Sequence, residues 1–160
     1  MRVRVVAVGS RMPAWVASAV DDYARRIPPE WRIEWREVRA EARGASGDAG
    51  VWMQREATRI RAALPDGAHR VALDEHGADD DSLAFAQRVG RWQRQARAVA
   101  IVIGGPDGLD PALLAACDER LRLSSLTLPH ALVRVVLAEQ LFRAWAILNG
   151  HPYHRGEATR

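Results

Sequence analysis

Apolar and polar residues follow two different periods along this chain, and the changes of period divide it into strands and helices. Runs that are apolar throughout, or at every second residue, predict strands at 2–9, 32–38, 69–77, 98–105 and the start of 121–130. Apolar residues at helical spacing predict helices at 12–27, 51–64, 81–95 and 131–149, with a short helix after Asp110. The glycine-containing residues 41–50 predict a flexible loop.

Proline, glycine and capping residues mark where several of these helices begin and end. Pro13 lies in the first turn of the first helix, where a missing N–H costs no hydrogen bond, and Pro28 stops that helix. Asp110 is a typical N-cap, and Pro111 suits the first helical position. Gly150 follows the last helix, where glycine readily adopts the left-handed conformation. The boundary signals therefore agree with the periodicity.

Strands that alternate with helices from end to end predict an α/β fold, in which a mostly parallel sheet has helices on both faces. The 160 residues fit one domain, 1–160, because no linker, repeat or low-complexity tract divides them. Ligands of such sheets bind outside the carboxyl ends of the strands. The loops that follow the last three strands are therefore the candidates for a functional site.

Bulk composition narrows the class of protein. No stretch has the roughly 20 apolar residues that span a bilayer, and the first residues lack the apolar core and cleavage site of a signal peptide. The single cysteine, Cys117, excludes an internal disulfide and fits a reducing compartment. It lies in an apolar run that predicts a buried, inert thiol. We therefore expect a cytoplasmic protein with no membrane partner.

All 23 lysine-plus-arginine positions are arginine, so the pI is near 9.9 although the net charge is only +3. Arginine binds phosphate through two N–H groups and stacks on bases, which suits an RNA partner. A GC-rich coding sequence, which favours arginine and alanine, explains the same composition without RNA. Tryptophan and arginine interleave near Trp31, Trp35 and Trp92, but these positions are typical of core residues rather than of base stacking.

The three candidate loops differ in chemistry. The sequence LDEHG (73–77) follows an apolar strand, GGPDGL (104–109) has paired glycines that let a ligand approach the backbone, and LSSLTLP (123–129) places hydroxyls among leucines. An apolar slot edged by backbone amides and hydroxyls suits an adenosine-like ligand. The glycines match neither GxGxxG nor GxxxxGKS/T, so they indicate neither a dinucleotide nor a Walker-type triphosphate site. An ordinary strand-to-helix turn is the alternative for this glycine pair.

The helix predicted at 131–149 is apolar around nearly its whole circumference. Such a helix must be covered on every side, and a terminal helix is rarely central in a small domain, so we expect a second copy of the chain to cover it. Glu139 and Arg143 are polar exceptions whose spacing favours an ion pair, with substrate contact as the alternative. The sequence thus predicts a homodimer through the C-terminal helix.

The terminal sequence HPYHRGEATR (151–160) places two histidines, a tyrosine and an arginine within five residues. On a tail without a packing role, such groups can stack on a flipped base, bind phosphate and move a proton. A tail exposed to solvent is the alternative. No cluster of Cys, Asp and Glu accompanies the histidines, so no metal site is expected. His130, directly after Pro129, fits a buried, hydrogen-bonded structural role instead.

Six segments of the chain are similar, in the same order and spacing, to one known family. They are VAVGSRMPAW near the start, LDEHG, IGGPDGL, LSSLTLPHALVR, AEQLFRAW and the terminal HPYHR. Over essentially all 160 residues the chain resembles the ribosomal RNA large-subunit methyltransferase H family, a branch of the SPOUT methyltransferases. The resemblance implies a SPOUT-type fold with a C-terminal trefoil knot, a homodimer, and S-adenosyl-L-methionine as methyl donor. It also implies methylation at N3 of a pseudouridine in 23S ribosomal RNA.

The resemblance also assigns site residues. It places the cofactor site in the three loops chosen above, at Leu73, Gly104, Leu123, Ser124, Ser125, Leu126, Thr127 and Leu128. We expect the tail residues Tyr153, His154 and Arg155 to hold the pseudouridine and to stabilise its deprotonated form, with His154 as the candidate general base. Because the helix before the tail is predicted at the subunit interface, we expect the tail of one subunit to reach the cofactor of the other.

Two other functions are compatible with the residues alone. A non-enzymatic RNA-binding assembly factor would have the same basic tail and no cofactor. An RNA-cleaving enzyme would use His130, His151 and His154 as acid and base. A single small domain offers little surface for RNA, so a methyltransferase of this size is expected to act on a folded ribosomal subunit or assembled ribosome rather than on naked RNA.

Overall fold

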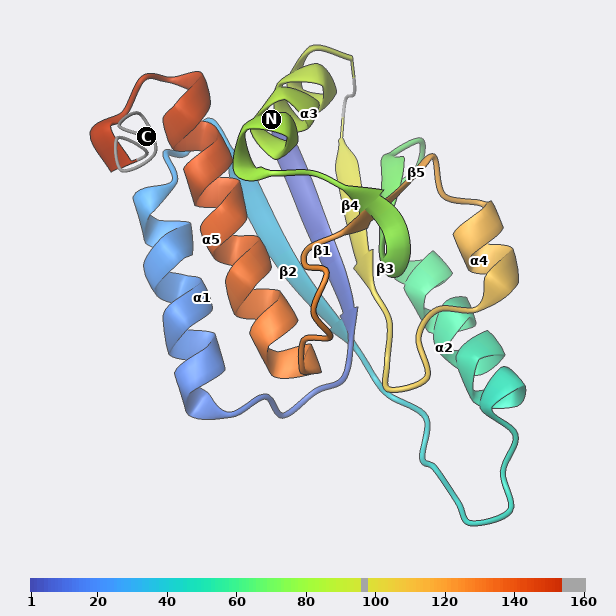
Figure 1. Ribbon diagram of the computed structural model, residues 1–160. Helices are drawn as coiled ribbons and strands as arrows, with labels where there is room; N and C mark the ends of the chain where they lie inside the picture. Colours follow the sequence, from blue (N-terminus) through green and yellow to red (C-terminus); the bar gives the residue numbers. More distant parts are fainter. Residues whose placement is uncertain (96–97, 154–160) are drawn as a thin grey trace.

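The computed structural model describes residues 1–95 and 98–153, which form one five-stranded sheet with helices. In chain order the strands are β1 (Arg2–Val8), β2 (Arg32–Val38), β3 (His69–Asp79), β4 (Val99–Ile103) and β5 (Glu119–Arg122). The helices are α1 (Ala14–Arg26), α2 (Ala49–Ala63), α3 (Ser82–Gln95), α4 (Pro111–Ala115) and α5 (His130–Leu148). The strands lie in the order β2-β1-β4-β3-β5 and pair in parallel (Figure 1). The α/β class predicted from the sequence is confirmed.

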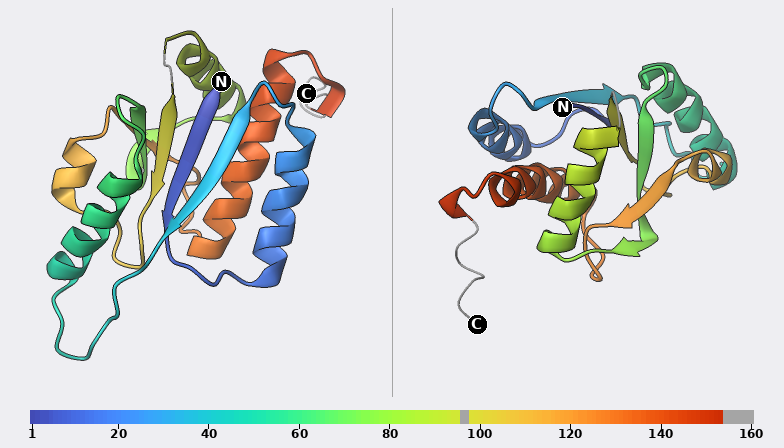
Figure 2. Two further views of the ribbon diagram at one scale, coloured as in Figure 1. Left: turned by 180° about the vertical axis from the view of Figure 1, so that it is seen from behind. Right: turned by 90° about the horizontal axis from the view of Figure 1, so that it is seen from above.

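Apolar side chains pack on both faces of the sheet, because successive residues of a strand point to opposite faces. Val3 and Val5 of β1 pack on the side of α3 and α5, whereas Val6 and Val8 pack on the side of α2 and α4. Viewed from above, α1, α3 and α5 cover one face and α2 and α4 the other (Figure 2). This arrangement leaves the carboxyl ends of the strands, at the lower edge of the sheet in Figure 1, for ligand binding.

Two expectations about single side chains can now be compared with the structure. Trp31 and Trp92 are buried in the core, as predicted from their positions on a strand face and a helix. Cys117 is only half-buried, because it lies at the margin of the core between the sheet and α4. Burial nevertheless raises the pKa of its thiol, so it is mainly protonated at neutral pH.

Observed element boundaries agree with the predicted ones to within two residues, and the extension of β3 has a structural consequence. β3 continues past a bulge because Ala78 and Asp79 pair with Leu121 and Arg122 of β5. A Cβ added to Gly77 would lie only 2.5 Å from the backbone of Leu121. The two segments approach so closely that only glycine fits at this position. The trefoil knot implied by the resemblance stays a prediction.

α5 lies in the middle of its helical layer, in contact with α1 on one side and α3 on the other (Figure 2). Its side chains buried within the protomer are Arg134, Leu137, Ala138, Leu141, Phe142, Ala144 and Ala146. The expectation that a terminal helix is not central is therefore wrong, since α1, α3 and the sheet cover most of α5. Leu132 and Leu148 remain 39% exposed. Within residues 1–95 and 98–153, no helix has the length and apolar character needed to cross a bilayer.

Candidate active site

A cavity of about 410 Å³ lies at the carboxyl ends of β3, β4 and β5. All three segments selected from the sequence contribute to its walls, because the carboxyl ends of parallel strands meet at one edge of a sheet. The first of them, 73–77, belongs to β3 itself and begins where β3 stops pairing with β4. Seven of the residues expected to bind the cofactor line it: Leu73, Gly104, Leu123, Ser124, Leu126, Thr127 and Leu128. Ser125 lies in the same loop but not among the lining residues. The structure therefore brings the expected cofactor residues together.

The loop after β4 is a tight turn that presents bare backbone to the cavity. The N–H of Gly108 donates to the carbonyl of Gly105 at 3.0 Å, and the φ of Gly108 is +88°, which favours glycine. A Cβ on Gly104 would lie 2.7 Å from the backbone carbonyl atoms of Gly108, so glycine is required there too. Asp110 then caps α4 by accepting the N–H of Leu113 at 3.0 Å, as the sequence predicted.

The loop after β5 supplies both polar and apolar groups. The hydroxyl oxygen of Ser124 accepts the N–H of Leu126 at 2.9 Å and so holds the loop in a turn. Leu126 itself is 76% exposed, although it lines the cavity. An exposed leucine in this place gives the mouth of the cavity an apolar edge. This edge suits the planar base of an adenosine-like ligand.

Sequence reasoning did not assign the carboxylates that also line the cavity, Asp74, Glu75 and Asp107. The signal was available, since all three lie inside the LDEHG and GGPDGL segments. Their negative charge suits a ligand with sulfonium and ammonium groups, while the leucines and bare backbone suit adenosine. The residues present thus fit S-adenosylmethionine. In the described part of the chain, no three His, Cys, Asp or Glu side chains are placed to hold a metal ion.

A second cavity, of about 600 Å³, adjoins the first and shares Leu121, Arg122 and Leu123 with it. Its other walls come from the beginning of α3 and from α5, including Ser82 and Gln140. The glycine loop does not contribute to it. Although this second cavity is larger, the smaller one has the strand ends and bare backbone typical of cofactor sites in α/β sheets.

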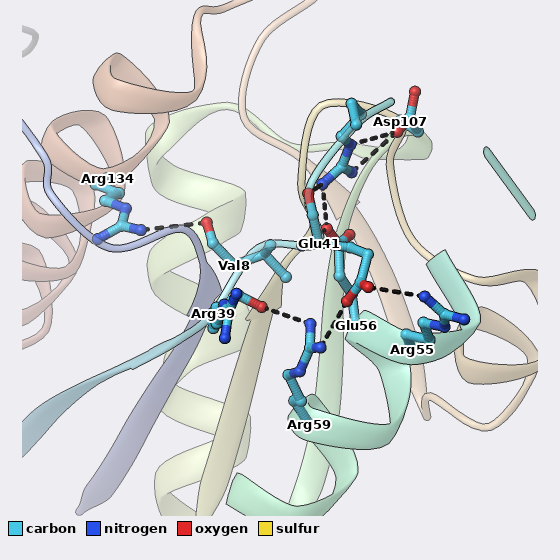
Figure 3. Close-up of polar contacts among 9 residues, drawn as sticks. Val8, Arg39, Glu41, Arg55, Glu56, Arg59, Asp107 and Arg134 are labelled. Carbon is cyan, nitrogen blue, oxygen red and sulfur yellow. Dashed lines mark hydrogen bonds and ion pairs between the residues drawn. The ribbon is translucent and has the colours of Figure 1, made fainter. Parts of the chain in front are cut away.

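His130 lies beside the smaller cavity, where β1 meets α5. Its Nε2 atom is 3.3 Å from Nη2 of Arg134; a guanidinium can only donate, so this nitrogen accepts and the ring is neutral. Arg134 is buried, pairs with Glu37 at 2.5 Å and donates to the carbonyl of Gly9 at 2.7 Å. It also donates to the carbonyl of Val8 at 3.3 Å (Figure 3). The hydrogen-bonded role considered for His130 is confirmed, but the ring is half-buried and lines the cavity.

Lowering the pH is expected to destabilise the fold through His130. Burial, followed by the charge of Arg134, holds the pKa of His130 below its ordinary value of 6.5. Near that pH the unfolded chain binds a proton that the folded chain does not, so the free energy of unfolding falls from about pH 7 towards about pH 5. His130→Gln should flatten this slope in urea denaturation. His76→Gln is the control, because the His76 side chain is 80% exposed, and equal slopes in both variants would contradict the prediction.

Tyr153 packs on the α5 helix of its own chain. Its hydroxyl donates to Oε1 of Glu139 at 3.0 Å, and its ring centroid lies 4.6 Å from that of Phe142. Burial and then Glu139 raise the pKa of Tyr153 to about 12, so the phenol is neutral at physiological pH. The expectation of a tail without a packing role is therefore wrong at Tyr153, because the chain turns back after Gly150. The predicted ion pair of Glu139 with Arg143 is confirmed at 2.6 Å.

The structure does not bring Tyr153 to the cavity of its own protomer. α5 begins beside the cavity at His130 and runs to Leu148, a rise of about 27 Å at about 1.5 Å per residue. Residues 150–153 follow at the end of the molecule opposite the carboxyl ends of the strands (Figure 1). His154 and Arg155 lie outside the described residues.

Comparison with known proteins defines the class of this chain. Its residues 1–154 match the family described as "Predicted SPOUT methyltransferase". A probable methylase family protein from Haemophilus influenzae Rd KW20 has a TM-score of 0.57 at 13% identity, over 95% of this chain and 70% of that one. A probable methyltransferase from Bordetella pertussis Tohama I has a TM-score of 0.54 at 19% identity, over 89% and 95%. These likenesses show a shared fold, and with the family match they define a SPOUT methyltransferase.

Relatives with similar sequences define the branch of that class. Proteins named "Ribosomal RNA large subunit methyltransferase H" are 57% identical in Bordetella petrii and 54% identical in Ralstonia pickettii, each over 97% of this chain and 99% of the relative. One from Burkholderia mallei is 56% identical over the same shares. The chain belongs to the ribosomal RNA large subunit methyltransferase H family, which confirms the resemblance seen in its motifs.

Proposed function

We propose that this chain transfers a methyl group from S-adenosyl-L-methionine to N3 of a pseudouridine in 23S ribosomal RNA. Family membership, with a relative 57% identical over nearly the whole chain, carries the assignment. The name of the relatives supplies the RNA class and the type of reaction. Pseudouridine and its N3 atom are the finer part of the proposal and come from the sequence resemblance.

We place the cofactor in the cavity at the carboxyl ends of β3, β4 and β5, with no metal ion. When bound, S-adenosylmethionine supplies an electrophilic methyl group on a sulfonium. Leu73 and the loop 123–128 would hold the adenosine, with the backbone of Gly104 against it. Asp74 and Glu75 would balance the positive charge of the cofactor. This arrangement would orient the methyl group, and orientation is the main source of rate in such a displacement.

The acceptor nitrogen must lose its proton before or during attack, and we assign this step to the tail. His154 is the proposed base, and Arg155 would stabilise the negative charge that develops on the pyrimidine. Tyr153 remains in the proposed group that holds the pseudouridine. Its raised pKa makes it a donor of a hydrogen bond rather than a base, and its contact with Glu139 holds Tyr153 itself against α5.

A second copy of the chain is proposed to complete each active site. The cavity lies beside the first turn of α5, while Tyr153 follows the other end of this helix (Figure 1). A tail that starts so far from its own cavity is better placed to reach the cavity of a partner. A twofold homodimer would satisfy both sites at once, because each copy supplies a cavity and a tail. The exposed Leu132 and Leu148 of α5 support a contact along this helix.

The proposed substrate is RNA held in a large ribosomal subunit or assembled ribosome. Non-specific RNA binding depends on unpaired positive charge. Within residues 1–95 and 98–153, ten arginines form ion pairs with carboxylates of the chain: Arg4, Arg26, Arg43, Arg55, Arg59, Arg61, Arg88, Arg122, Arg134 and Arg143. Affinity for naked RNA is therefore expected to be weak, and the shape of a folded subunit would supply the missing contacts.

Incubation with tritium-labelled S-adenosylmethionine and ribosomes from cells that lack the protein tests the proposal. We expect label in full-length 23S RNA, and mass spectrometry should place one methyl group on N3 of a pseudouridine. RNA binding without calorimetric binding of the cofactor would favour an assembly factor. Shortened RNA would favour a nuclease. Equal labelling of free RNA and of intact subunits would contradict the proposed substrate.

A further inference from the structure

Arg43, in the loop between β2 and α2, joins three segments of the chain. Its Nη1 atom is 2.5 Å from Oε1 of Glu56 on α2 and also donates to the carbonyl of Glu41 at 2.6 Å. Its Nε and Nη2 atoms donate to Oδ2 of Asp107, in the glycine loop after β4, at 3.0 and 2.9 Å. Figure 3 shows that Glu41, Glu56 and Asp107, the three partners of Arg43, lie close to one another. One guanidinium therefore links the β2–α2 loop, α2 and a wall of the cofactor cavity.

Glu56 is the buried partner in this cluster. It is 1% exposed, and its Oε1 atom also accepts the backbone N–H of Glu41 at 2.8 Å. Its Oε2 atom is buried without a hydrogen-bond partner among the described residues. A buried carboxylate is tolerated only when an opposite charge and hydrogen bonds compensate it. Arg43 supplies both, so the position of Glu56 depends on Arg43.

The outer side of the glycine loop rests directly on these two side chains. A Cβ added to Gly105 would lie 2.8 Å from Oε2 of Glu56 and 3.3 Å from Nη2 of Arg43. Two residues further on, Asp107 accepts both N–H groups of Arg43. The same loop lines the cavity from Gly104 to Leu109, whereas Arg43 and Glu56 do not line it.

We propose that Arg43 is a positioning residue of the cofactor cavity, which acts through Asp107 and Glu56 on the glycine loop 104–108. The inference rests on the proposed function, because it concerns binding of S-adenosylmethionine in this cavity. The planar guanidinium holds two carboxylates in fixed directions, and a lysine ammonium lacks this geometry. With these contacts intact, the glycine loop is already ordered before the cofactor binds. Binding therefore loses less conformational entropy, and the affinity is higher.

Two variants test the proposal, and both leave the residues that line the cavity unchanged. Arg43→Lys keeps the positive charge beside Glu56 and removes the planar guanidinium, while Glu56→Gln removes the buried carboxylate that this guanidinium holds. We expect each to raise the Kd for S-adenosylmethionine about tenfold in calorimetry. The kcat at saturating cofactor and the KM for RNA should change less than about twofold. Once the cofactor is bound, the proposed catalytic residues are the same as in the unaltered chain.

The matched control is Asp22→Asn, which breaks the exposed ion pair of Asp22 with Arg26 on α1. It should leave the Kd unchanged, because neither residue lines the cavity. The double variant Arg43→Lys with Glu56→Gln should bind no more weakly than either single variant, since both remove the same contact. A Kd that rises about a hundredfold in the double variant would mean independent effects and would overturn the proposal.

Hydrogen exchange of the ligand-free protein provides a measurement that does not need the cofactor. In Arg43→Lys the amides of 104–109 should exchange faster, while those of β1 and β4 exchange as in the unaltered chain. Unchanged exchange in this loop, or an unchanged Kd in Arg43→Lys, would overturn the positioning role. Should the unaltered chain fail to bind S-adenosylmethionine, the proposed function falls, and the exchange result still decides whether Arg43 orders the loop.

Discussion

A chain that ends at Tyr153 is expected to bind S-adenosylmethionine as tightly as the full chain and to methylate RNA at least about a hundredfold more slowly. Tyr153 keeps its ring contact with Phe142 and its hydrogen bond to Glu139, so the packing at the end of α5 is preserved. His154 and Arg155 are lost, and with them the proposed base and the positive charge beside the reacting pyrimidine. Calorimetry measures cofactor binding, and single-turnover transfer of a labelled methyl group measures the chemical step.

The matched control is a chain that ends at Arg155. It lacks only residues 156–160, to which no function is assigned, and should transfer at the full rate. Transfer at the full rate by the chain that ends at Tyr153 would remove the tail from catalysis. A large loss of cofactor affinity in that chain would instead make the tail part of the cofactor site.

Gly104→Val is expected to weaken binding of S-adenosylmethionine by at least about a hundredfold. The first atom of any side chain here would lie 2.7 Å from the carbonyl of Gly108 and 3.0 Å from Cγ of Leu109. The loop must move to relieve these contacts. Because its backbone forms a wall of the cavity, the movement changes the shape of the cofactor site. Calorimetry measures the loss of affinity, and thermal unfolding shows whether the fold survives.

Gly44→Ala serves as the control for the glycine substitution. An added Cβ at Gly44 meets no atom within 4 Å, so both stability and cofactor affinity should stay close to those of the unaltered chain. If Gly104→Val binds the cofactor within about threefold of the unaltered chain, the glycine loop is not a wall of the cofactor site.

The elements and the location of the site follow from local features of the sequence. The periods of the apolar residues and the Asp110–Pro111 signal define strands and helices without knowledge of the tertiary structure. The rule that ligands bind at the carboxyl ends of parallel strands then selects three loops. Leu73 lies where β3 stops pairing with β4, and Gly104 and 123–128 follow β4 and β5 of the same sheet, so their meeting at one cavity could be predicted.

The features that sequence reasoning missed depend on contacts between distant residues. Arg43 lies in a stretch predicted only as a flexible loop, and its partner Asp107 is 64 residues away, so no local period indicates their ion pair. Tyr153 turns back onto Glu139, a contact that depends on how the chain leaves Gly150. The central place of α5 depends on its packing between α1 and α3, which local periods do not determine.

The contacts of Arg134 bear on how a newly made polypeptide reaches its final shape. This guanidinium satisfies the carbonyls of Val8 and Gly9, which were synthesised 126 and 125 positions earlier. These two hydrogen bonds at the end of β1, and the packing of α1 and α3 against α5, can form only after α5 has been synthesised. Contacts of such long range slow folding, because a large loop must close before they form. A protein proposed to modify ribosomes thus reaches its working form only after α5 has been synthesised.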